Sequence, residues 1–330
     1  MKICVLGEFY GHPDEGMRKL SFQLAAGLSK KGHEVLALDV RDTYRMRFWR
    51  WRHIAAFEPH IIQYVHGQPF VSLLIMKLLS FYYRRAKIVV YSTHPSFSLP
   101  LKKLLPLFKP DLILTQSYET EKMFLKYGCE TTFLPAGVDL ERFKPASAKL
   151  KQELREKYRL DKDKFIILHI GSIKKVRNVR LLERVARDDN QVIVVGSTST
   201  GVEKDTLQHL QKHGCLVWVK YFENIEEIYA LSDCYVFPTV RPMGSIELPL
   251  SVLEAMSCNL AVISTKFGAL PRMFEARDGL IFADKEGDFI KGLEKVKSGI
   301  EVKNREKVLP YSWESIVQRL EGIYEEILRR

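Results

Sequence analysis

The sequence predicts an α/β protein with two doubly wound domains, each built on a parallel sheet. Three observations lead to this fold class. Short apolar runs of strand length alternate with segments of helical spacing, which is typical of parallel sheets covered by helices. The alternation stops at residues 134–147 and restarts after Asp161. The chain has 330 residues, enough for two domains of about 150 residues each.

The first predicted domain opens with a strand, a loop, a helix and a second strand. An apolar run at 3–6 predicts the strand, and the spacing of Leu20, Leu24 and Leu28 predicts a helix that ends before Gly32. The loop between them has the glycine spacing G-x3-G-x4-G, which differs from the G-x-G-x-x-G dinucleotide fingerprint and argues against NAD. Further strands are predicted at 35–40, 60–65, 87–91, 111–115 and 131–134, and further helices at 70–84 and 118–127.

A linker is predicted at residues 134–147, LPAGVDLERFKPAS. It contains Pro135, Gly137 and Pro145 and has no clear hydrophobic period. Ligands of such two-domain proteins favour the cleft between the domains. The elements predicted after the linker are strands at 165–170, 192–195, 216–219, 234–237 and 260–264, and helices at 179–185, 206–212, 225–231, 250–256, 288–296 and 313–328.

The composition is that of a soluble globular protein, with 46% hydrophobic and 28% charged residues. A strand starts at Lys2, so no signal peptide is expected, and the apolar run at 70–83 contains Lys77 and is too short to span a bilayer. The cysteines are odd in number and scattered, which favours neither a disulfide framework nor a zinc site and fits a reducing cytoplasm. They are Cys4, Cys129, Cys215, Cys234 and Cys258.

Positive charge is concentrated in the first half of the chain. The net charge is +11, and residues 1–146 hold 21 Lys or Arg against 13 Asp or Glu. Within them, the stretch from Arg41 to Arg52 interleaves basic and aromatic side chains, a composition suited to an anionic membrane surface. The alternative is a solvated loop or helix whose Phe48 and Trp51 pack inward. Nucleic acid is not expected as a partner, because no nucleic-acid motif accompanies the charge.

Residues 233–259, DCYVFPTVRPMGSIELPLSVLEAMSCN, predict a strand, a polar loop and a helix. A loop that leads from a strand to a helix N-terminus is an anion site in open α/β sheets, because unpaired N–H groups and the helix dipole point toward the ligand. Glu247 and Glu254 lie two helical turns apart, so both could face one ligand. The alternative is a plain core face with Glu254 in solvent.

Two further segments carry candidate chemistry. GSIKKVRN at 171–178 follows a predicted strand and places cations before a helix, which suits a diphosphate, although the Walker spacing is absent and an exposed basic loop is the alternative. His94 follows the strand at 87–91, where binding residues collect, although a lone histidine is often structural. Asp161 and Asp163 are expected in a solvated turn. The motifs of serine hydrolases and zinc proteases are absent.

Taken together, these segments resemble the retaining, GT-B-fold glycosyltransferases of family 4, the group 1 transferases that use nucleotide sugars. The resemblance covers nearly the whole chain and rests on the order of its parts. These are GHEV at 32–35, DLILTQS at 111–117, PAGVDLERFKP at 135–145, GSIKKVRN, YALSDCYVFPT at 229–239, PLSVLEAMSCN at 249–259, STKFGALP at 264–271 and YSW at 311–313.

The resemblance implies two Rossmann-like domains that face each other across a cleft. Residues 1–146 would be the acceptor-side domain and 147–312 the donor-binding domain, with the helix at 313–330 packing back on the first. By position, Gly171 and Arg177 match the family's donor-diphosphate loop. Ser172 replaces the loop's usual arginine, so Lys174 or Lys175 is expected to supply the missing contact.

Further roles follow from the family's E-x7-E motif. Glu254 matches the glutamate that binds the ribose hydroxyls, a task for a bidentate acceptor. The other glutamate is expected at Ile246 but stands at Glu247, one place late. Pro249 replaces a small residue and has no N–H to offer. The remaining phosphate donors would be the amides of Leu250 and Ser251.

Three positions complete the implied site. Gly16 matches the glycine region of the sugar and acceptor cleft. His94 matches the first-domain histidine that touches the transferred sugar, and together with Glu247 it is the implied catalytic pair. Tyr221 matches a position that contacts the nucleotide base.

The implied reaction is transfer of a sugar from a UDP- or GDP-linked donor to an acceptor hydroxyl, with retention at the anomeric carbon. The resemblance implies no metal and no cofactor, since the nucleotide sugar is a co-substrate. The expected partners are this donor, an acceptor that is lipid-linked or a glycan, and the anionic inner face of the membrane. The alternatives are a nucleotide-sugar epimerase of the same fold and a non-catalytic module that binds sugar or nucleic acid.

Overall fold

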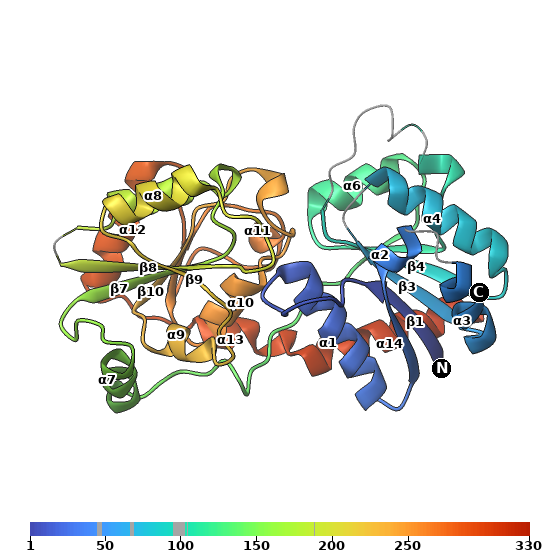
Figure 1. Ribbon diagram of the computed structural model, residues 1–330, viewed down its shortest axis with the longest axis horizontal. Coiled ribbons are helices and arrows are strands. Elements are labelled where there is room, and N and C mark those ends of the chain that lie inside the picture. Colours follow the sequence, from blue (N-terminus) through green and yellow to red (C-terminus); the bar gives the residue numbers. More distant parts are fainter. Residues whose placement is uncertain (45–47, 67–68, 95–102, 104, 188) are drawn as a thin grey trace. The chain divides into compact units, whose positions relative to one another are not determined.

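The computed structural model describes residues 1–44, 48–66, 69–94, 103, 105–187 and 189–330. The chain divides into two compact units, and each contains one sheet with helices on both faces (Figure 1). The division between Ala136 and Gly137 falls within the predicted linker. Unit 1 comprises Met1–Ala136, Ile246–Leu248 and Trp313–Arg330, and unit 2 comprises Gly137–Ser245 and Pro249–Ser312.

Unit 1 contains a six-stranded parallel sheet of order β2-β1-β3-β4-β5-β6. Cys4 in β1 pairs with Leu36 of β2 on one side and Ile62 of β3 on the other. The strand order reverses between β1 and β3, which makes the carboxyl ends of these strands a switch point. The strands are β1 (Lys2–Gly7), β2 (Glu34–Asp39), β3 (Ile61–His66), β4 (Lys87–Ser92), β5 (Leu112–Thr115) and β6 (Thr131–Phe133).

The helices of unit 1 cover both faces of this sheet. On one face, Ile54, Leu79 and Phe124 pack with the strands in one hydrophobic core. On the other, helices α1 and α14 pack together, and Tyr324 in α14 donates a 2.6 Å hydrogen bond to Gln63 of β3. The helices are α1 (Gly16–Lys30), α2 (Val40–Tyr44), α3 (Phe48–Phe57), α4 (Pro69–Tyr82), η1 (Leu105–Leu107), α6 (Tyr118–Lys126) and α14 (Trp313–Arg329).

Unit 2 contains a second six-stranded parallel sheet, of order β12-β11-β10-β7-β8-β9. Numbered from its own first strand, this is the Rossmann order 3-2-1-4-5-6 read from the other edge. The order reverses between β7 and β10, which lie side by side. The strands are β7 (Phe165–Ile170), β8 (Asn190–Gly196), β9 (Leu216–Val219), β10 (Cys234–Phe237), β11 (Ala261–Ser264) and β12 (Leu280–Phe282).

The helices of unit 2 also cover both faces of the sheet (Figure 1). Leu182, Leu210 and Phe289 pack in one core with residues of β7, β8, β10 and β11. The predicted helix at 179–185 is a 3₁₀ helix. The elements are α7 (Ala148–Lys157), η2 (Lys175–Arg177), η3 (Val179–Arg184), α8 (Lys204–Lys212), α9 (Glu226–Ala230), η4 (Pro242–Gly244), α10 (Leu250–Ser257), α11 (Leu270–Met273), α12 (Glu286–Lys297), α13 (Asn304–Val308) and η5 (Leu309–Tyr311).

Within the described part of the chain, every helix falls short of the length and apolar character that a bilayer crossing requires.

Candidate functional site

The carboxyl ends of β7 and β10 define the candidate site of unit 2. Ligands of open α/β sheets bind at such a reversal of strand order, because the loops on either side diverge and leave a crevice. Gly171 follows β7 directly, and Thr239 follows β10 after Pro238. Residues near both loops were predicted from the sequence to bind a donor.

Arg177 lies directly over Gly171. A Cβ atom on Gly171 would collide with Nη1 of Arg177 and would lie 3.1 Å from its Cζ. The absence of a side chain at this position therefore leaves room for the guanidinium at the carboxyl end of β7. Because an arginine carries its charge at every physiological pH, a fixed cation stands at the switch point.

The backbone around Arg177 is held by the loop that follows β10. Thr239 donates its hydroxyl to the Arg177 carbonyl at 3.4 Å, and the Asn178 side chain donates to the Pro238 carbonyl at 3.2 Å. Asn178 has the left-handed φ of 56° that ends η2. A Cβ on Gly244 would lie 3.0 Å from the Val176 carbonyl oxygen, so η2 and η4 approach closely. These contacts fix the origin of the arginine side chain.

The other cations of this loop differ in their surroundings. The Lys175 ammonium lies 3.1 Å from Asp205, and the Lys175 backbone N–H donates to Glu203 at 2.8 Å. Lys174 is half-buried and has no ion-pair partner among the residues that the structure describes. Ser172 is buried, and its carbonyl accepts the N–H of Lys174. The Lys175 ammonium is therefore directed toward α8, which contains Asp205.

Tyr235 joins the end of β7 to the start of α10. Its hydroxyl donates to the Ile170 carbonyl at 3.3 Å and is also hydrogen-bonded to Ser251. Burial raises the pKa of this phenol, so it remains protonated and can donate. The sequence did not single out Tyr235, because it lies within the apolar run of a strand.

The N-terminus of α10 offers free backbone donors. The N-cap residue Pro249 makes no side-chain capping hydrogen bond, and Leu250 and Ser251 are the first helical residues. The N–H groups of a first helical turn have no partner four residues earlier, and the helix dipole is positive there. An anion beside Ser251 would therefore find amide donors as well as the Arg177 guanidinium.

Glu254 lies one turn further along α10. Glu254 is only 4% exposed, and its Oε2 accepts a 2.8 Å hydrogen bond from the Tyr229 hydroxyl. The Tyr229 ring lies 6.0 Å from the ring of Tyr235. Tyr235 thus connects the two groups of predicted donor residues, Ser251 with Glu254 and Gly171 with Arg177. Tyr221, in contrast, follows β9, two strands from β7 in the sheet.

His169 is a further polar residue that the sequence analysis did not identify. It is fully buried near the end of β7, and its Nδ1 lies 2.9 Å from the Val236 carbonyl, which requires a proton on Nδ1. Burial and, to a smaller extent, the nearby Arg177 lower the pKa of His169 to about 4, although the hydrogen bond to Val236 partly opposes the shift. Within the described residues Nε2 has no hydrogen-bond partner. The ring is therefore a neutral acceptor beside Gly171.

Glu247 belongs to unit 1 rather than to the unit that holds Glu254. It is 4% exposed, and its Oε1 accepts hydrogen bonds from the hydroxyls of Ser117, at 2.5 Å, and Thr120. Its backbone N–H donates to the Thr93 carbonyl at 2.9 Å. The two hydroxyl hydrogen bonds attach the carboxylate to the N-cap and first turn of α6.

One oxygen of Glu247 is left without a protein partner. Oε2 is buried and has no hydrogen-bond partner among the described residues. Burial raises the pKa of this carboxyl, although the hydroxyls of Ser117 and Thr120 partly oppose the shift. His94 follows Thr93 and lies within 3.3 Å of the Thr93 hydroxyl through Nδ1. The implied catalytic pair is therefore linked through Thr93.

Ile246 occupies the position where the family's first glutamate is expected. A Cβ on Gly16 would lie 2.8 Å from Cδ1 of Ile246, so the isoleucine packs on the glycine at the start of α1. The side chain of Glu15 caps this helix by accepting the N–H groups of Met17 and Arg18. Gly16 is therefore covered by an apolar side chain, and part of the first helical turn is already satisfied.

The basic stretch from Arg41 to Arg52 is only partly described. Residues 45–47 lie outside the described residues. Arg41 binds Asp39 through a 2.9 Å contact between Nε and Oδ1, and its guanidinium lies over the ring of Tyr10. Burial alone would raise the pKa of Asp39, but hydrogen bonds from the Arg41 side chain and from three backbone N–H groups lower it to about 2. Arg41 therefore stabilises the loop after β1, through Asp39 and Tyr10.

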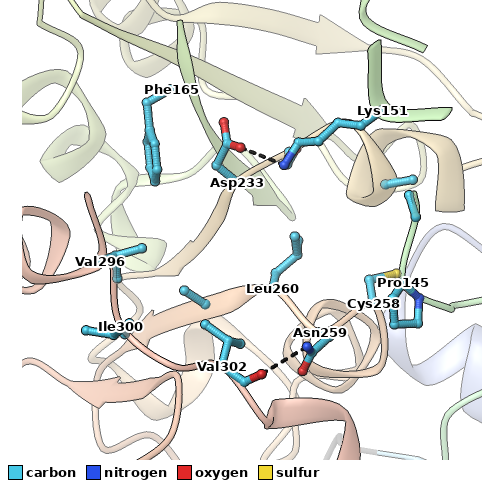
Figure 2. Close-up of a pocket in the computed structure, with 14 residues that line it drawn as sticks. Pro145, Lys151, Phe165, Asp233, Cys258, Asn259, Leu260, Val296, Ile300 and Val302 are labelled. Atoms are coloured by element: carbon cyan, nitrogen blue, oxygen red, sulfur yellow. Dashed lines mark hydrogen bonds and ion pairs between the residues drawn. The ribbon is translucent and has the colours of Figure 1, made fainter. Parts of the chain in front are cut away.

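A cavity of about 360 Å³ lies at the amino ends of strands of the unit 2 sheet, away from the carboxyl ends that form the candidate site (Figure 2). It opens near Asp233 and Leu260, which precede β10 and β11. The Asp233 carboxylate is already bound by Lys151 and Arg155, both at 2.6 Å, and Asn259 donates to the Val302 carbonyl at 3.0 Å. Because the cations and the Asn259 amide already have partners, the cavity presents no evident set of donors for an anionic ligand.

The sequence of unit 2 matches a known family model. Residues 151–308 match the model described as "Glycosyl transferases group 1". The matched range contains Gly171, Arg177, Tyr235 and Glu254. The group 1 resemblance drawn from the motifs is supported over this range.

Several characterised proteins are similar to the chain at low identity. An N-acetyl-alpha-D-glucosaminyl L-malate synthase of Bacillus anthracis is 25% identical over 54% of the chain and 49% of its own length. A GDP-mannose-dependent monoacylated alpha-(1-6)-phosphatidylinositol monomannoside mannosyltransferase of Corynebacterium glutamicum is 26% identical over 54% and 50%. A phosphatidylinositol N-acetylglucosaminyltransferase component of Arabidopsis thaliana is 24% identical over 81% and 63%. The chain thus spans about half the length of the first two.

Solved glycosyltransferase structures share the fold. A glycosyltransferase from Rickettsia africae superposes with a TM-score of 0.79 at 15% identity, covering 100% of this chain and 99% of that one. Anabaena HepE in complex with UDP and glucose superposes with a TM-score of 0.76 at 14% identity, covering 99% and 100%. The predicted fold class, a GT-B protein with two Rossmann-like domains, is confirmed.

Proposed function

We propose that the chain is a retaining glycosyltransferase of family 4, which moves a sugar from a UDP- or GDP-linked donor to an acceptor hydroxyl. One observation carries the proposal. Arg177 is fixed over Gly171 at the β7/β10 switch point, within the range that matches the group 1 model. A fixed cation at that place suits a diphosphate.

In the proposed donor complex, three kinds of group bind the diphosphate. Arg177 supplies a bidentate cation, Lys174 a second charge, and the amides of Leu250 and Ser251 the helix N-terminus. Together they stabilise the charge that develops on the departing diphosphate, so the proposal requires no metal and no cofactor. Lys175, whose ammonium pairs with Asp205, would add only a small long-range attraction for the diphosphate.

Two residues contact the nucleoside in this proposal. Glu254 accepts hydrogen bonds from the ribose hydroxyls, and its Tyr229 contact, at 2.8 Å, orients the carboxylate. Tyr221 contacts the base. The names of similar proteins support both donor types, since the Corynebacterium relative is GDP-mannose-dependent and HepE was solved with UDP.

The proposed reaction exchanges one bond at the anomeric carbon for another on the same face. The bond to the diphosphate oxygen breaks and its electron pair leaves with the phosphate, while the acceptor oxygen forms the new bond. The acceptor proton passes to the departing phosphate, so no enzyme nucleophile is needed. We assign His94 and the free Oε2 of Glu247 to orienting the sugar.

We further propose a peripheral position on an anionic membrane, with a lipid-linked acceptor. At the end of α4, Phe81 and Tyr82 are 63% and 64% exposed, and Arg84 lies over the Phe81 ring. Exposed aromatic rings beside arginines suit the headgroup region. Two of the similar proteins carry phosphatidylinositol in their names.

Liposome flotation tests the membrane proposal. Vesicles with anionic lipid should carry the protein to the top fraction in a salt-sensitive way, and the double substitution Phe81→Ser with Tyr82→Ser should abolish this. Tyr118→Ser, which removes an exposed ring from α6, is the matched control and should float normally. Flotation of the double variant equal to that of the unaltered protein would contradict this surface.

The reaction itself is tested in two steps. Nucleoside diphosphates are first screened for a rise in melting temperature, since a ligand that binds the native state stabilises it. Sugars of the best nucleotide are then incubated with phosphatidylinositol dispersed in detergent or with a glycan acceptor. We expect nucleoside diphosphate release that depends on an acceptor, and NMR should show the anomeric configuration of the donor in the product. A changed sugar without transfer would identify an epimerase, and donor binding without turnover a non-catalytic module.

A further inference from the structure

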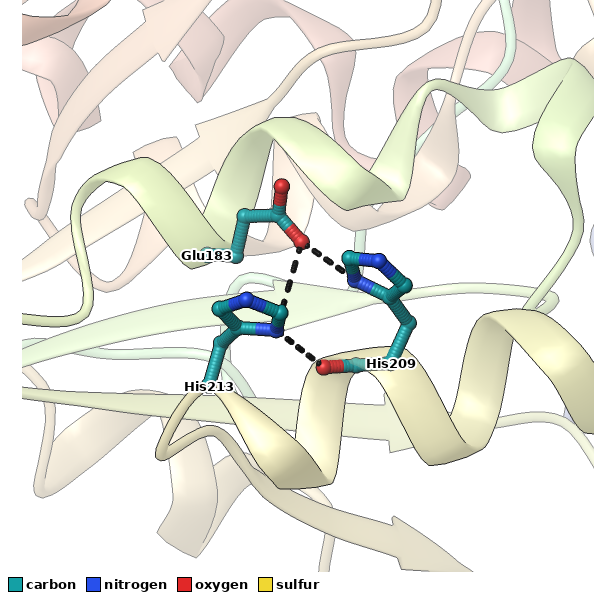
Figure 3. Close-up of side chains that lie close together, drawn as sticks. All are labelled: Glu183, His209 and His213. Atoms are coloured by element: carbon teal, nitrogen blue, oxygen red, sulfur yellow. Dashed lines mark hydrogen bonds and ion pairs between the residues drawn. The ribbon is translucent and has the colours of Figure 1, made fainter.

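Three potential metal ligands lie together on the face of unit 2 formed by η3 and α8 (Figure 3). They are Glu183 of η3, His209 of α8 and His213, which follows α8 at its C-cap. Each offers one ligand atom, and these atoms all lie within 4.8 Å of one another. None of the three is used by the proposed transfer reaction.

The two histidines face the same oxygen of Glu183. Nδ1 of His209 lies 2.7 Å and Nδ1 of His213 lies 3.7 Å from Oε2. The rings stack with centroids 4.5 Å apart, as the spacing of four residues along a helix allows. Nδ1 of His213 is also 2.8 Å from the His209 carbonyl. Figure 3 shows the carboxylate directed toward both rings.

Oε2 of Glu183 is approached by the two histidines, whereas the neighbouring arginine approaches the other oxygen. Arg184 approaches the other oxygen of Glu183, Oε1, at 3.9 Å and also pairs with Glu286. The Glu183 side chain is 13% exposed, whereas His209 and His213 are 35% and 43% exposed. An ion from solvent can therefore reach the imidazoles, and the carboxylate forms the inner wall of the site.

We propose that Glu183, His209 and His213 bind a divalent transition metal, with zinc as the best match. Two imidazole nitrogens and one carboxylate oxygen are a ligand set for zinc or its neighbours, whereas magnesium and calcium prefer oxygen ligands only. Metal–ligand distances of about 2.0–2.2 Å are reached by small side-chain rotations from the observed spacing. The fourth position is left to water.

Metal binding would require each imidazole to move its proton from Nδ1 to Nε2. A neutral His209 donates the Nδ1 proton to Glu183, so coordination through Nδ1 places that proton on Nε2, and the carboxylate binds the ion instead of the N–H. His213 would likewise give up its contact with the His209 carbonyl. The metal would then tie η3 to α8 and stabilise the segment that directly follows Arg177.

The test uses untagged protein freed of metal with a chelator, and zinc chloride in competition with a chromophoric chelator. All five cysteines are buried, so their thiols are withheld from the ion in the native state. We expect one zinc per chain. Glu183→Gln, His209→Gln and His213→Gln should each weaken binding by at least about tenfold, since even loss of an outer-shell partner has an effect of that size. Equal melting temperatures in excess chelator would show that the variants fold.

Two matched controls should bind zinc like the unaltered protein. His53→Gln removes an exposed imidazole from α3, and Glu286→Gln removes the carboxylate that shares Arg184. Zinc binding that survives all three single substitutions would overturn the proposal. A loss with the histidine variants but not with Glu183→Gln would overturn the three-ligand site and leave only a histidine pair. Neither outcome bears on nucleotide binding, which is measured without added metal.

Discussion

The guanidinium of Arg177 occupies the space that a side chain on Gly171 would need. The two residues are separated by a loop, yet a single Cβ atom at the glycine would collide with Nη1 of the arginine. The loop after β10 fixes the arginine backbone through Thr239 and Asn178. The position of the cation thus depends on the glycine below it as much as on the loop that carries it.

Gly171→Ala should weaken nucleoside diphosphate binding and should also lower the melting temperature, because the φ of +157° at Gly171 is one that residues with a side chain rarely adopt. The colliding atom is the far end of a flexible side chain, so the arginine can swing away at low cost, but it then leaves the anion site. We expect about tenfold weaker binding by calorimetry, equivalent to about 1.4 kcal/mol. Gly201→Ala is the matched control, because its Cβ would meet no atom within 4 Å. Unchanged affinity in the Gly171 variant would show that the position of Arg177 over Gly171 does not determine ligand binding.

Lys174 and Lys175 should differ in their contribution to donor binding. Lys174 has no ion-pair partner among the described residues, whereas the Lys175 ammonium is directed to Asp205. Lys174→Ala should therefore weaken diphosphate binding about tenfold, within the range for a hydrogen bond to a charged group, and Lys175→Ala by less than about twofold. The reverse order, measured by the same titration, would mean that Lys175 leaves Asp205 for the ligand.

Glu254 should confer a preference for ribose. We expect the unaltered protein to bind a nucleoside diphosphate about 10- to 100-fold more tightly than its 2′,3′-dideoxy analogue, because two hydroxyls donate to a charged acceptor. Glu254→Gln keeps an oxygen for Tyr229 but loses the charge, so this preference should shrink. A thermodynamic cycle from four titrations isolates the coupling. An undiminished preference in the variant would place the ribose elsewhere.

Glu247 should make stability depend on pH. Burial raises the pKa of its carboxyl above the ordinary value of 4.5. The folded state therefore binds the proton more tightly than the unfolded state, and this contribution is complete below about pH 4.5 and is lost as the pH rises through the folded pKa. Urea unfolding should show the free energy of unfolding of Glu247→Gln gaining on the unaltered protein between pH 4.5 and 8. A constant difference, or one that changes in the opposite direction, would contradict a raised pKa.

Much of the fold could be predicted because parallel strands buried on both faces give continuous apolar runs. The runs at 3–6 and 165–170 correspond to β1 and β7, and the alternation with helices indicated the parallel sheets. Helix α7 was missed because it lies between the linker and the second strand pattern and is highly charged. The short strand β12 was missed because three residues carry little periodicity.

The site was less accessible to sequence reasoning. Tyr235 and His169 lie within apolar strands, so their contacts at the switch point depend on the pairing of β7 with β10. The ion pair of Lys175 with Asp205 joins separate elements. Glu183 meets His209 and His213 only because η3 packs on α8. These side chains come from segments that are far apart in the sequence, so the local spacing of residues could not predict their contacts.

Calorimetric titration of UDP and GDP into the unaltered protein and Arg177→Ala tests the central assignment most directly. We expect one of the two nucleotides to bind with one site per chain, and the variant to bind it about 10- to 100-fold more weakly because a charge-assisted contact is lost. The melting temperature of the unliganded variant should match that of the unaltered protein. Equal affinity in a folded Arg177→Ala variant would contradict a donor diphosphate site at this residue.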